Sequence, residues 1–186
     1  MVLAVWIVEQ NSPPSGLGGV LASTPWCPNM KPRLYLETTI PSYLTAWPSR
    51  DLIVAAHQQI TKEWWRTRRD VFEMCVSQFV LDEAGAGDTD AARERLEVLK
   101  PLPLLDITES VLQLASALLA SGIIPDKAAR DAAHIAISAV HGIDYLMTWN
   151  CAHIANATII KTVQTVCVQN GFSCPVICTP EELMGS

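Results

Sequence analysis

The stretch PDKAARDAAHIAISAVHGIDYLMTWN (residues 125–150) decides the fold. Its first part carries apolar residues at helical spacing, with Asp126 at the start and Gly142 at the end, which are residue types that favour a helix beginning and a helix end. The run IDYLMTW follows at once and is typical of a short strand. The stretch therefore predicts a helix that leads through a glycine into a strand.

The same alternation extends outward in both directions. Upstream, the strand-like runs RLYLE, VFEMCVS and LPLLDI are separated by the helical patterns DLIVAAHQQITKEWW, SQFVLDEAGAG, TDAARERLEVLK and ESVLQLASALLASG. Downstream, NATIIKTVQTVCVQNG is helical and PVICTP is a final strand. Strands separated by helices indicate βαβ units, so we expect an α/β fold in which helices cover both faces of a central parallel sheet.

Residues 1–30 differ in composition from the rest of the chain. They contain four prolines and neither Lys nor Arg. We expect a poorly ordered or non-native extension there, followed by a single domain over residues 31–186, because KPRLYLETTIPSYL opens with a strand-like pattern directly after Met30. An extra edge strand from Val2 to Val8 is the alternative interpretation.

Bulk composition narrows the class of protein. The chain is 49% hydrophobic and 17% charged, which excludes disorder, and no apolar run approaches the roughly 20 residues of a membrane span. The six cysteines form no C-x-x-C pair, and the N-terminus carries no secretory signal pattern. We therefore expect reduced, mostly buried thiols and a cytoplasmic location.

The distribution of charge leaves nucleic-acid binding open. A net charge of −6 is unusual for a nucleic-acid binder, but acidic residues that gather divalent cations would reverse the local field. The one basic cluster, KEWWRTRR (residues 62–69), fits three interpretations. The first is a surface that stacks on unpaired RNA bases. The second is a basic helix end with its tryptophans in the core, and the third is part of a surface that contacts a partner or a second copy.

Polar residues stand where two strands run out. Glu37 follows RLYL and Asn150 follows DYLMTW. Ligands of parallel α/β sheets bind beyond the carboxyl ends of the strands, so both oxygen donors are candidate site residues. The alternative is that they are ordinary turn residues, because strands end in turns.

Two helices add further carboxylates. Asp131 lies in the first turns of its helix, where the helix dipole favours negative charge. It is the first residue of a polar stripe that continues through His134, Ser138 and His141. A helix face exposed to solvent would show the same pattern. In SQFVLDEAGAGD, Glu83 lies beside apolar residues and next to Asp82, and either acid is a candidate.

Three blocks together resemble the PIN domain, in particular bacterial VapC-type toxins. They are LYLETTIPSY (residues 34–43), VSQFVLDEAGAGD (76–88) and DAAHIAISAVHGIDYLMTWNCAHIANA (131–157). The likeness covers about residues 32 to 180. It implies a Rossmann-like, three-layer α/β/α fold and an endoribonuclease that gathers acidic side chains around one or two Mg²⁺ or Mn²⁺ ions.

The resemblance assigns a role to each candidate. Glu37 corresponds to the first acid of the family, Glu83 to its central Glu and Asp131 to its helical Asp. Thr38 or Thr39 supplies the hydroxyl beside the first acid, and Asn150 stands where the family often has Asp. Because Glu37 is one methylene longer than the usual Asp and Asn150 carries no charge, a weaker metal site is implied.

The expected function is therefore a metal-dependent endoribonuclease that cleaves RNA and is controlled by an antitoxin. The antitoxin and a second copy of the chain are its candidate protein partners. A catalytically weak or inactive PIN module that binds RNA or a protein is the alternative. A phosphate- or nucleotide-handling enzyme would need a Gly-rich loop, and no G-x-G-x-x-G or Walker A sequence follows any predicted strand.

Overall fold

The computed structural model describes residues 30–185. The two interpretations of the N-terminal segment, an extension or an edge strand from Val2 to Val8, fall on residues 1–29 and lie outside the described residues. Within the described part, no helix has both the length and the apolar character that crossing a bilayer requires.

One sheet organises the described residues, and all of its neighbouring strands are parallel. Its five strands are β1 (Arg33–Leu36), β2 (Glu73–Ser77), β3 (Leu104–Leu105), β4 (Tyr145–Met147) and β5 (Val176–Cys178). The central strands are short apolar runs that are buried on both faces, as parallel strands require. The predicted α/β class with a parallel sheet is confirmed.

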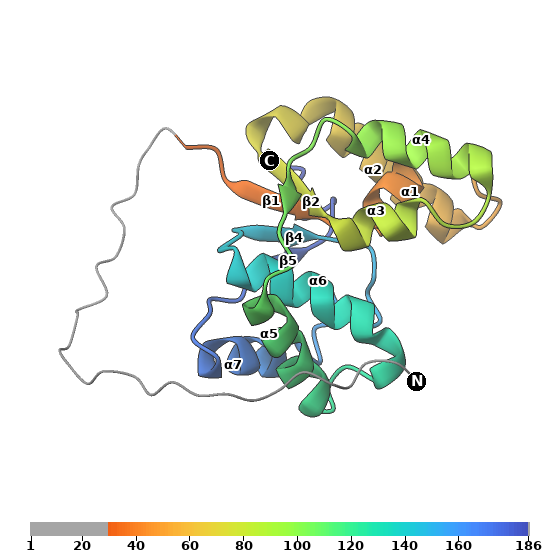
Figure 1. The fold of residues 1–186 in the computed structure, drawn as a ribbon. Coiled ribbons are helices and arrows are strands. Elements are labelled where there is room, and N and C mark those ends of the chain that lie inside the picture. The colour runs from red at the N-terminus through yellow and green to blue at the C-terminus, as the bar shows by residue number, and fades with distance from the viewer. Residues whose placement is uncertain (1–29, 186) are drawn as a thin grey trace, which may run out of the picture. The chain divides into compact units, whose positions relative to one another are not determined.

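Helices cover the sheet on both faces and make a three-layer fold. Figure 1 shows α1 to α4 on one side of the sheet and α5 to α7 on the other. The helices are α1 (Thr39–Thr45), α2 (Leu52–Thr67), α3 (Gln78–Ala84), α4 (Thr89–Leu99), α5 (Glu109–Ala120), α6 (Ala129–Val140) and α7 (Ile160–Gln169), with short 3₁₀ turns η1 (Arg69–Val71) and η2 (Asp126–Ala128).

The strand order explains the two layers of helices. The order is β3-β2-β1-β4-β5, so the chain moves outward from β1 to β3 and then returns past β1 to β4 and β5. Crossovers of one hand place their helices on opposite faces when the direction of travel reverses. The strand order therefore reverses between β1 and β4: the connection after β1 leads toward one edge of the sheet, and the connection after β4 leads toward the other.

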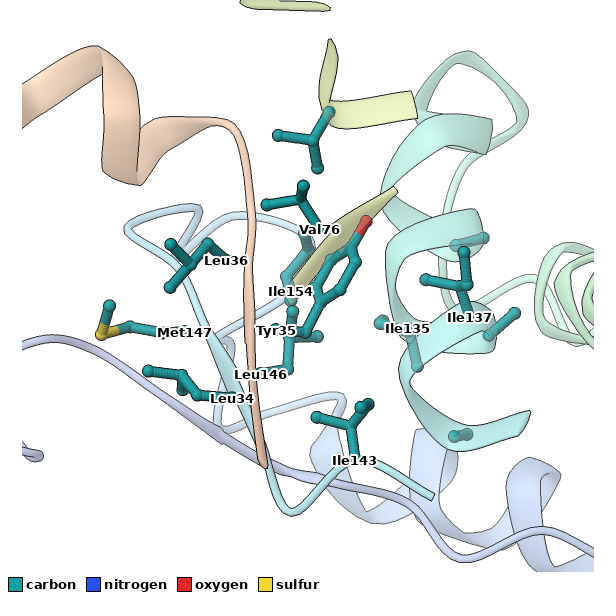
Figure 2. Packing of buried hydrophobic residues seen from close by; sticks show 14 of the residues in the cluster. Leu34, Tyr35, Leu36, Val76, Ile135, Ile137, Ile143, Leu146, Met147 and Ile154 are labelled. Atoms are coloured by element: carbon teal, nitrogen blue, oxygen red, sulfur yellow. The ribbon is translucent and has the colours of Figure 1, made fainter. Parts of the chain in front are cut away.

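The core lies on both sides of β1. Figure 2 shows Leu34 and Leu36 on one side of this strand and Tyr35 on the other, toward α6. All three side chains are fully buried. Helix α6 is buried along most of its length, from Ala132 to Ala139, because it packs on the sheet and on α5. A helix that packs against neighbours on two sides needs apolar residues around most of its circumference, as α6 has.

The structure differs from the sequence prediction mainly at α1. The sequence predicted no element between the strand-like run RLYLE and the helical pattern DLIVAAHQQITKEWW, but helix α1 begins at Thr39. Its proline, Pro41, lies in the first turn, where the missing N–H costs nothing because that position has no intrahelical partner. A smaller difference is that the segment expected to be helical from residue 156 becomes an α-helix only at Ile160.

The cysteines of the described part agree with the expectation of reduced and mostly buried thiols. Cys75, Cys167 and Cys178 are buried, Cys174 is half-buried and Cys151 is exposed, and all five are free. Burial raises the pKa of Cys75 to about 11, which keeps this thiol protonated and unreactive.

Candidate metal centre

The candidate site lies where the strand order reverses. Beyond the carboxyl ends of β1 and β4 the two connections leave toward opposite faces of the sheet, which is where ligands of open parallel sheets bind. Glu37 follows β1 directly, and Thr148 follows β4 directly. The backbone N–H of Glu37 donates to the carbonyl of Met147 at 3.1 Å, so the two strand ends are fixed to each other.

Glu37 is buried and held by three donors on one oxygen. Only 4% of the residue is exposed. Its Oε2 accepts from the Thr39 backbone N at 3.0 Å, from Thr39 Oγ1 at 2.5 Å and from Thr148 Oγ1 at 2.7 Å. Its Oε1 makes no hydrogen bond to any described residue. The carboxylate is therefore fixed in orientation and keeps one oxygen free as a ligand.

Glu83 enters the site from α3. Its Oε2 accepts from Thr38 Oγ1 and lies 3.2 Å from His134 Nε2, and its Oε1 lies 3.5 Å from Arg130 Nη1. Burial acts to raise the pKa of Glu83, but the hydrogen bonds from His134 and Thr38 and the charges of His134 and Arg130 outweigh it. The pKa of Glu83 lies below its ordinary value, and the group is ionised at neutral pH.

The neighbouring acid, Asp82, is not part of the site. It is exposed, and its Oδ1 accepts from Gln78 Nε2 at 2.8 Å on the surface of α3. The sequence allowed either Asp82 or Glu83 as the site residue, and in the structure it is Glu83 that points toward Thr38 and His134.

His134 is a site residue whose role the sequence did not reveal. It is 1% exposed, and its Nδ1 lies 2.8 Å from the Tyr35 hydroxyl, which is itself 2.7 Å from Ser77 Oγ. A continuous chain of hydrogen bonds thus runs from Ser77 through Tyr35 and His134 to Glu83. Burial raises the pKa of Tyr35 far above its ordinary value, so the phenol remains neutral.

The polar stripe on α6 is therefore not a solvated face, and that interpretation is wrong. His134 and Ser138 are both buried, because α6 is enclosed by the sheet and by α5. The one sequence signal for His134 was its position three residues after Asp131, which puts the two side chains on neighbouring turns of one helix face.

Asp131 and Asn150 form the outer side of the site. Both are half-buried. Burial raises the pKa of Asp131 and the charge of Glu83 adds to this, while hydrogen bonding to Asn150 and the charges of His153 and His134 act against it. The net result is a pKa above the ordinary value. Asp131 is thus within electrostatic reach of Glu83 and His134.

Asn150 is tied to both sides of the site. Its backbone N–H donates to Thr148 Oγ1 at 2.8 Å, the same hydroxyl that donates to Glu37. Its Oδ1 accepts from the His153 backbone N at 3.1 Å. The segment after β4 therefore connects the buried Glu37 with the more accessible Asp131.

Trp149 anchors this segment, a role that could not be predicted from the sequence pattern. Its backbone N–H donates to Thr39 Oγ1 at 2.8 Å, and its indole Nε1 donates to Thr61 Oγ1 at 2.7 Å. The His57 ring stacks on the indole with centroids 3.9 Å apart. These contacts tie Trp149 to α2 and to Thr39, one of the two threonines that position Glu37.

Three side chains converge closely enough to hold one ion. Glu37, Glu83 and His134 each offer a ligand atom, and these atoms lie within 4.8 Å of one another. Asp131 and Asn150 stand beside this group, and Thr38 contacts Glu83 rather than Glu37. The hydroxyl that contacts Glu37 belongs to Thr39. A buried pair of carboxylates with an imidazole is a donor set that suits a divalent cation.

The basic cluster at residues 62–69 lies at the opposite end of the sheet. Helix α2 ends there, and η1 leads from it to the amino end of β2 at Glu73. Trp64 is fully buried, and Trp65 is half-buried with the Arg69 guanidinium 5.7 Å from its ring centroid. The interpretation that Trp64 stacks on RNA is wrong, and the basic helix end with core tryptophans describes the structure.

No family model, curated protein or solved structure matches this chain. The assignment of a function therefore depends on the residues of the site themselves.

Proposed function

We propose that this chain is a metal-dependent endoribonuclease, a PIN-domain protein of the VapC-like toxin kind. It hydrolyses RNA phosphodiester bonds in the cytoplasm under the control of an antitoxin, and it associates with a second copy of itself. The observation that carries the proposal is the meeting of Glu37, Glu83 and His134 within 4.8 Å, with Asp131 beside them. Carboxylates this close repel each other unless a cation compensates them, and Mg²⁺ or Mn²⁺ prefers such ligands.

The donor set fits a divalent ion. Glu37 Oε1 has no hydrogen-bond partner among the described residues, and a cation bound beside it would be one. Such an ion makes a bound water more acidic and polarises the scissile phosphate. Thr39 and Thr148 hold Glu37 in place for this, and Thr38 does the same for Glu83.

Asp131 has the properties of a proton acceptor at the mouth of the site. It is half-buried, and its pKa is raised mainly by burial. A raised pKa makes a carboxylate a better base toward water, and the hydrogen bond to Asn150 and the charge of His153 limit the rise. At the same edge, Arg130 is 57% exposed and lies 3.5 Å from Glu83. Its guanidinium offers an RNA phosphate a positive partner in an otherwise acidic site.

One observation favours the second candidate, a catalytically weak or inactive PIN module that binds RNA or a protein. Arg130 and His134 both contact Glu83, so part of its charge is compensated without an ion. Asn150 adds no negative charge to the cluster. A site with this balance binds an ion less tightly than one with four carboxylates.

A cleavage assay decides between the two candidates. Purified full-length protein is incubated with single-stranded and structured RNAs in Mg²⁺, in Mn²⁺ and in EDTA. Cleavage that requires an ion supports the enzyme, provided that an Asp131→Asn preparation purified in parallel is at least about tenfold slower, which excludes contaminating nucleases. No cleavage of any RNA with either ion contradicts the enzyme, and a gel-shift measurement on the same RNAs then tests the binding module.

A further inference from the structure

His134 presents one ring nitrogen to the site and commits the other to the core. Its Nε2 lies 3.2 Å from Glu83 Oε2, and its Nδ1 lies 2.8 Å from the Tyr35 hydroxyl. At 1% exposure the ring has no freedom to turn elsewhere. We infer that His134 Nε2 is a direct metal ligand, so that the ion sits in a mixed site of one imidazole and two carboxylates that selects Mn²⁺ and other first-row transition metals over Mg²⁺.

The inference rests on the proposed function, because it concerns the same ion, but it changes the composition of the site. A set of oxygen ligands alone would use Glu37, Glu83, Asp131 and Asn150 and would leave His134 as a donor to Glu83. Of the three carboxylates in this set, only Glu37 and Glu83 belong to the group whose ligand atoms lie within 4.8 Å of one another, and the third member of that group is His134. The spacing therefore favours the imidazole as the third ligand.

The distances suit coordination of a single ion. Ligand atoms on neighbouring positions around an octahedral ion with bonds of about 2.1 Å lie about 3 Å apart. The separation of 3.2 Å between His134 Nε2 and Glu83 Oε2 is close to this. The third position is open, because Glu37 is 4% exposed and its Oε1 has no hydrogen-bond partner among the described residues. A carboxylate oxygen without a hydrogen-bond partner beside this pair is available to bind a cation.

The contacts of Tyr35 allow Nε2 to bind an ion. When the ring hydrogen of His134 resides on Nδ1, the Tyr35 oxygen accepts it and the Tyr35 hydroxyl donates to Ser77. Nε2 then carries a lone pair that faces the two carboxylates. Metal-binding histidines generally have their other ring nitrogen hydrogen-bonded in this way, which fixes the tautomer and the orientation of the ring.

The choice of ion follows from the ligand types. Mg²⁺ takes oxygen ligands almost exclusively, whereas imidazole suits the later first-row metals, whose affinity rises from Mn²⁺ through Co²⁺ and Ni²⁺. One nitrogen with two carboxylates therefore binds Mn²⁺ more tightly than Mg²⁺. We expect the Mn²⁺ affinity to exceed the Mg²⁺ affinity by at least about tenfold.

Pulsed electron paramagnetic resonance on the full-length protein with one equivalent of MnCl₂ tests the inference directly. Nitrogen bound to Mn²⁺ gives a ¹⁴N hyperfine coupling, which oxygen ligands do not. We expect this coupling in the wild type, its change to a ¹⁵N pattern when histidine is labelled with ¹⁵N, and its loss in His134→Gln. His153→Gln is the matched control, because His153 lies beside Asp131, and it keeps the coupling.

Each outcome separates the inference from the proposed function. Bound Mn²⁺ without nitrogen coupling, or with a coupling that survives His134→Gln, overturns the inference while leaving an RNA-cleaving site of oxygen ligands intact. Wild-type protein that binds no Mn²⁺ overturns it as well. Nitrogen coupling in a protein that cleaves no RNA supports the metal site and contradicts the nuclease. If His134→Gln does not fold, the ¹⁵N pattern of the labelled wild type decides together with His153→Gln, because a coupling that persists without His153 leaves His134 as the histidine in the site.

Discussion

Glu37 and Asp131 belong to one site but are held in opposite ways. Glu37 follows a strand in the middle of the sheet, is almost fully buried, and has three donors on one oxygen. Asp131 lies in the first turn of a helix, is half-buried, and has a pKa that burial raises. The comparison indicates that the carboxylate of Glu37 is held in one orientation by its donors, whereas that of Asp131 lies nearer to solvent and is more easily protonated.

The largest effect is expected for Glu37→Gln. The new carbonyl oxygen would still accept from Thr39 and Thr148, so the fold should survive, but an amide nitrogen would replace the free Oε1 and cannot bind a cation. Metal-dependent RNA cleavage should fall by at least about 100-fold. Thr39→Ser keeps the hydroxyl and serves as the control. Cleavage by Glu37→Gln within about threefold of the wild type would show that the inner carboxylate is structural.

A smaller loss is expected for Asp131→Asn, because this residue stands outside the group of three that converges most closely. Cleavage should fall at least about tenfold, since one carboxylate of an already under-charged site is neutralised. Asp126→Asn changes an exposed acid in η2, at the entrance to the same helix, and should leave the rate unchanged. Equal rates for the two variants would contradict the assignment of Asp131 to the site.

The smallest effect concerns stability without metal. Folding raises the pKa of Asp131, so its ionisation costs more free energy in the folded protein than in the unfolded chain. This cost appears as the pH rises from the unfolded pKa through the folded pKa, and it is fully present above both. In EDTA at pH 7, Asp131→Asn should therefore be more stable than the wild type, by less than about 1 kcal/mol because the group is half-exposed.

Thermal unfolding between pH 4 and pH 8 measures this difference. The gain in Tm should be at most about 3 °C at pH 7 and should shrink as the pH falls, because the wild-type carboxyl then takes up a proton. A variant that is less stable than the wild type at pH 7 in EDTA would show that the negative charge of Asp131 stabilises the fold.

Most of the fold could be predicted because its signals are local. Apolar strands and helical patterns alternate along the chain, and Gly122 and Gly142, each with a positive φ, stand just beyond the ends of α5 and α6. Helix α1 could not be predicted, because its β-branched residues and Pro41 resemble a strand followed by a turn. Its helical state depends on packing against α2 and α4.

The site was accessible to sequence reasoning only in part. Strand ends and helix starts have fixed places in a parallel sheet, so Glu37 and Asp131 could be expected at one edge. His134 could not be distinguished from a solvated residue, because burial of its helix face depends on α5 and the sheet, which are distant in sequence. Thr38 contacts Glu83 and Thr39 contacts Glu37. These partners could not be predicted, because the two residues lie between a strand and a helix, where neither periodicity determines the direction of a side chain.

The most direct test of the metal centre compares two adjacent acids on α3. Glu83 contacts Thr38 and His134 inside the site, whereas Asp82 contacts only Gln78 on the surface. RNA cleavage in Mn²⁺ is measured for Glu83→Gln and Asp82→Asn, each with its Tm in EDTA. We predict a rate within about twofold of the wild type for Asp82→Asn and at least about tenfold lower for Glu83→Gln, with both variants folded. Equal rates for two folded variants would contradict a metal centre at Glu83.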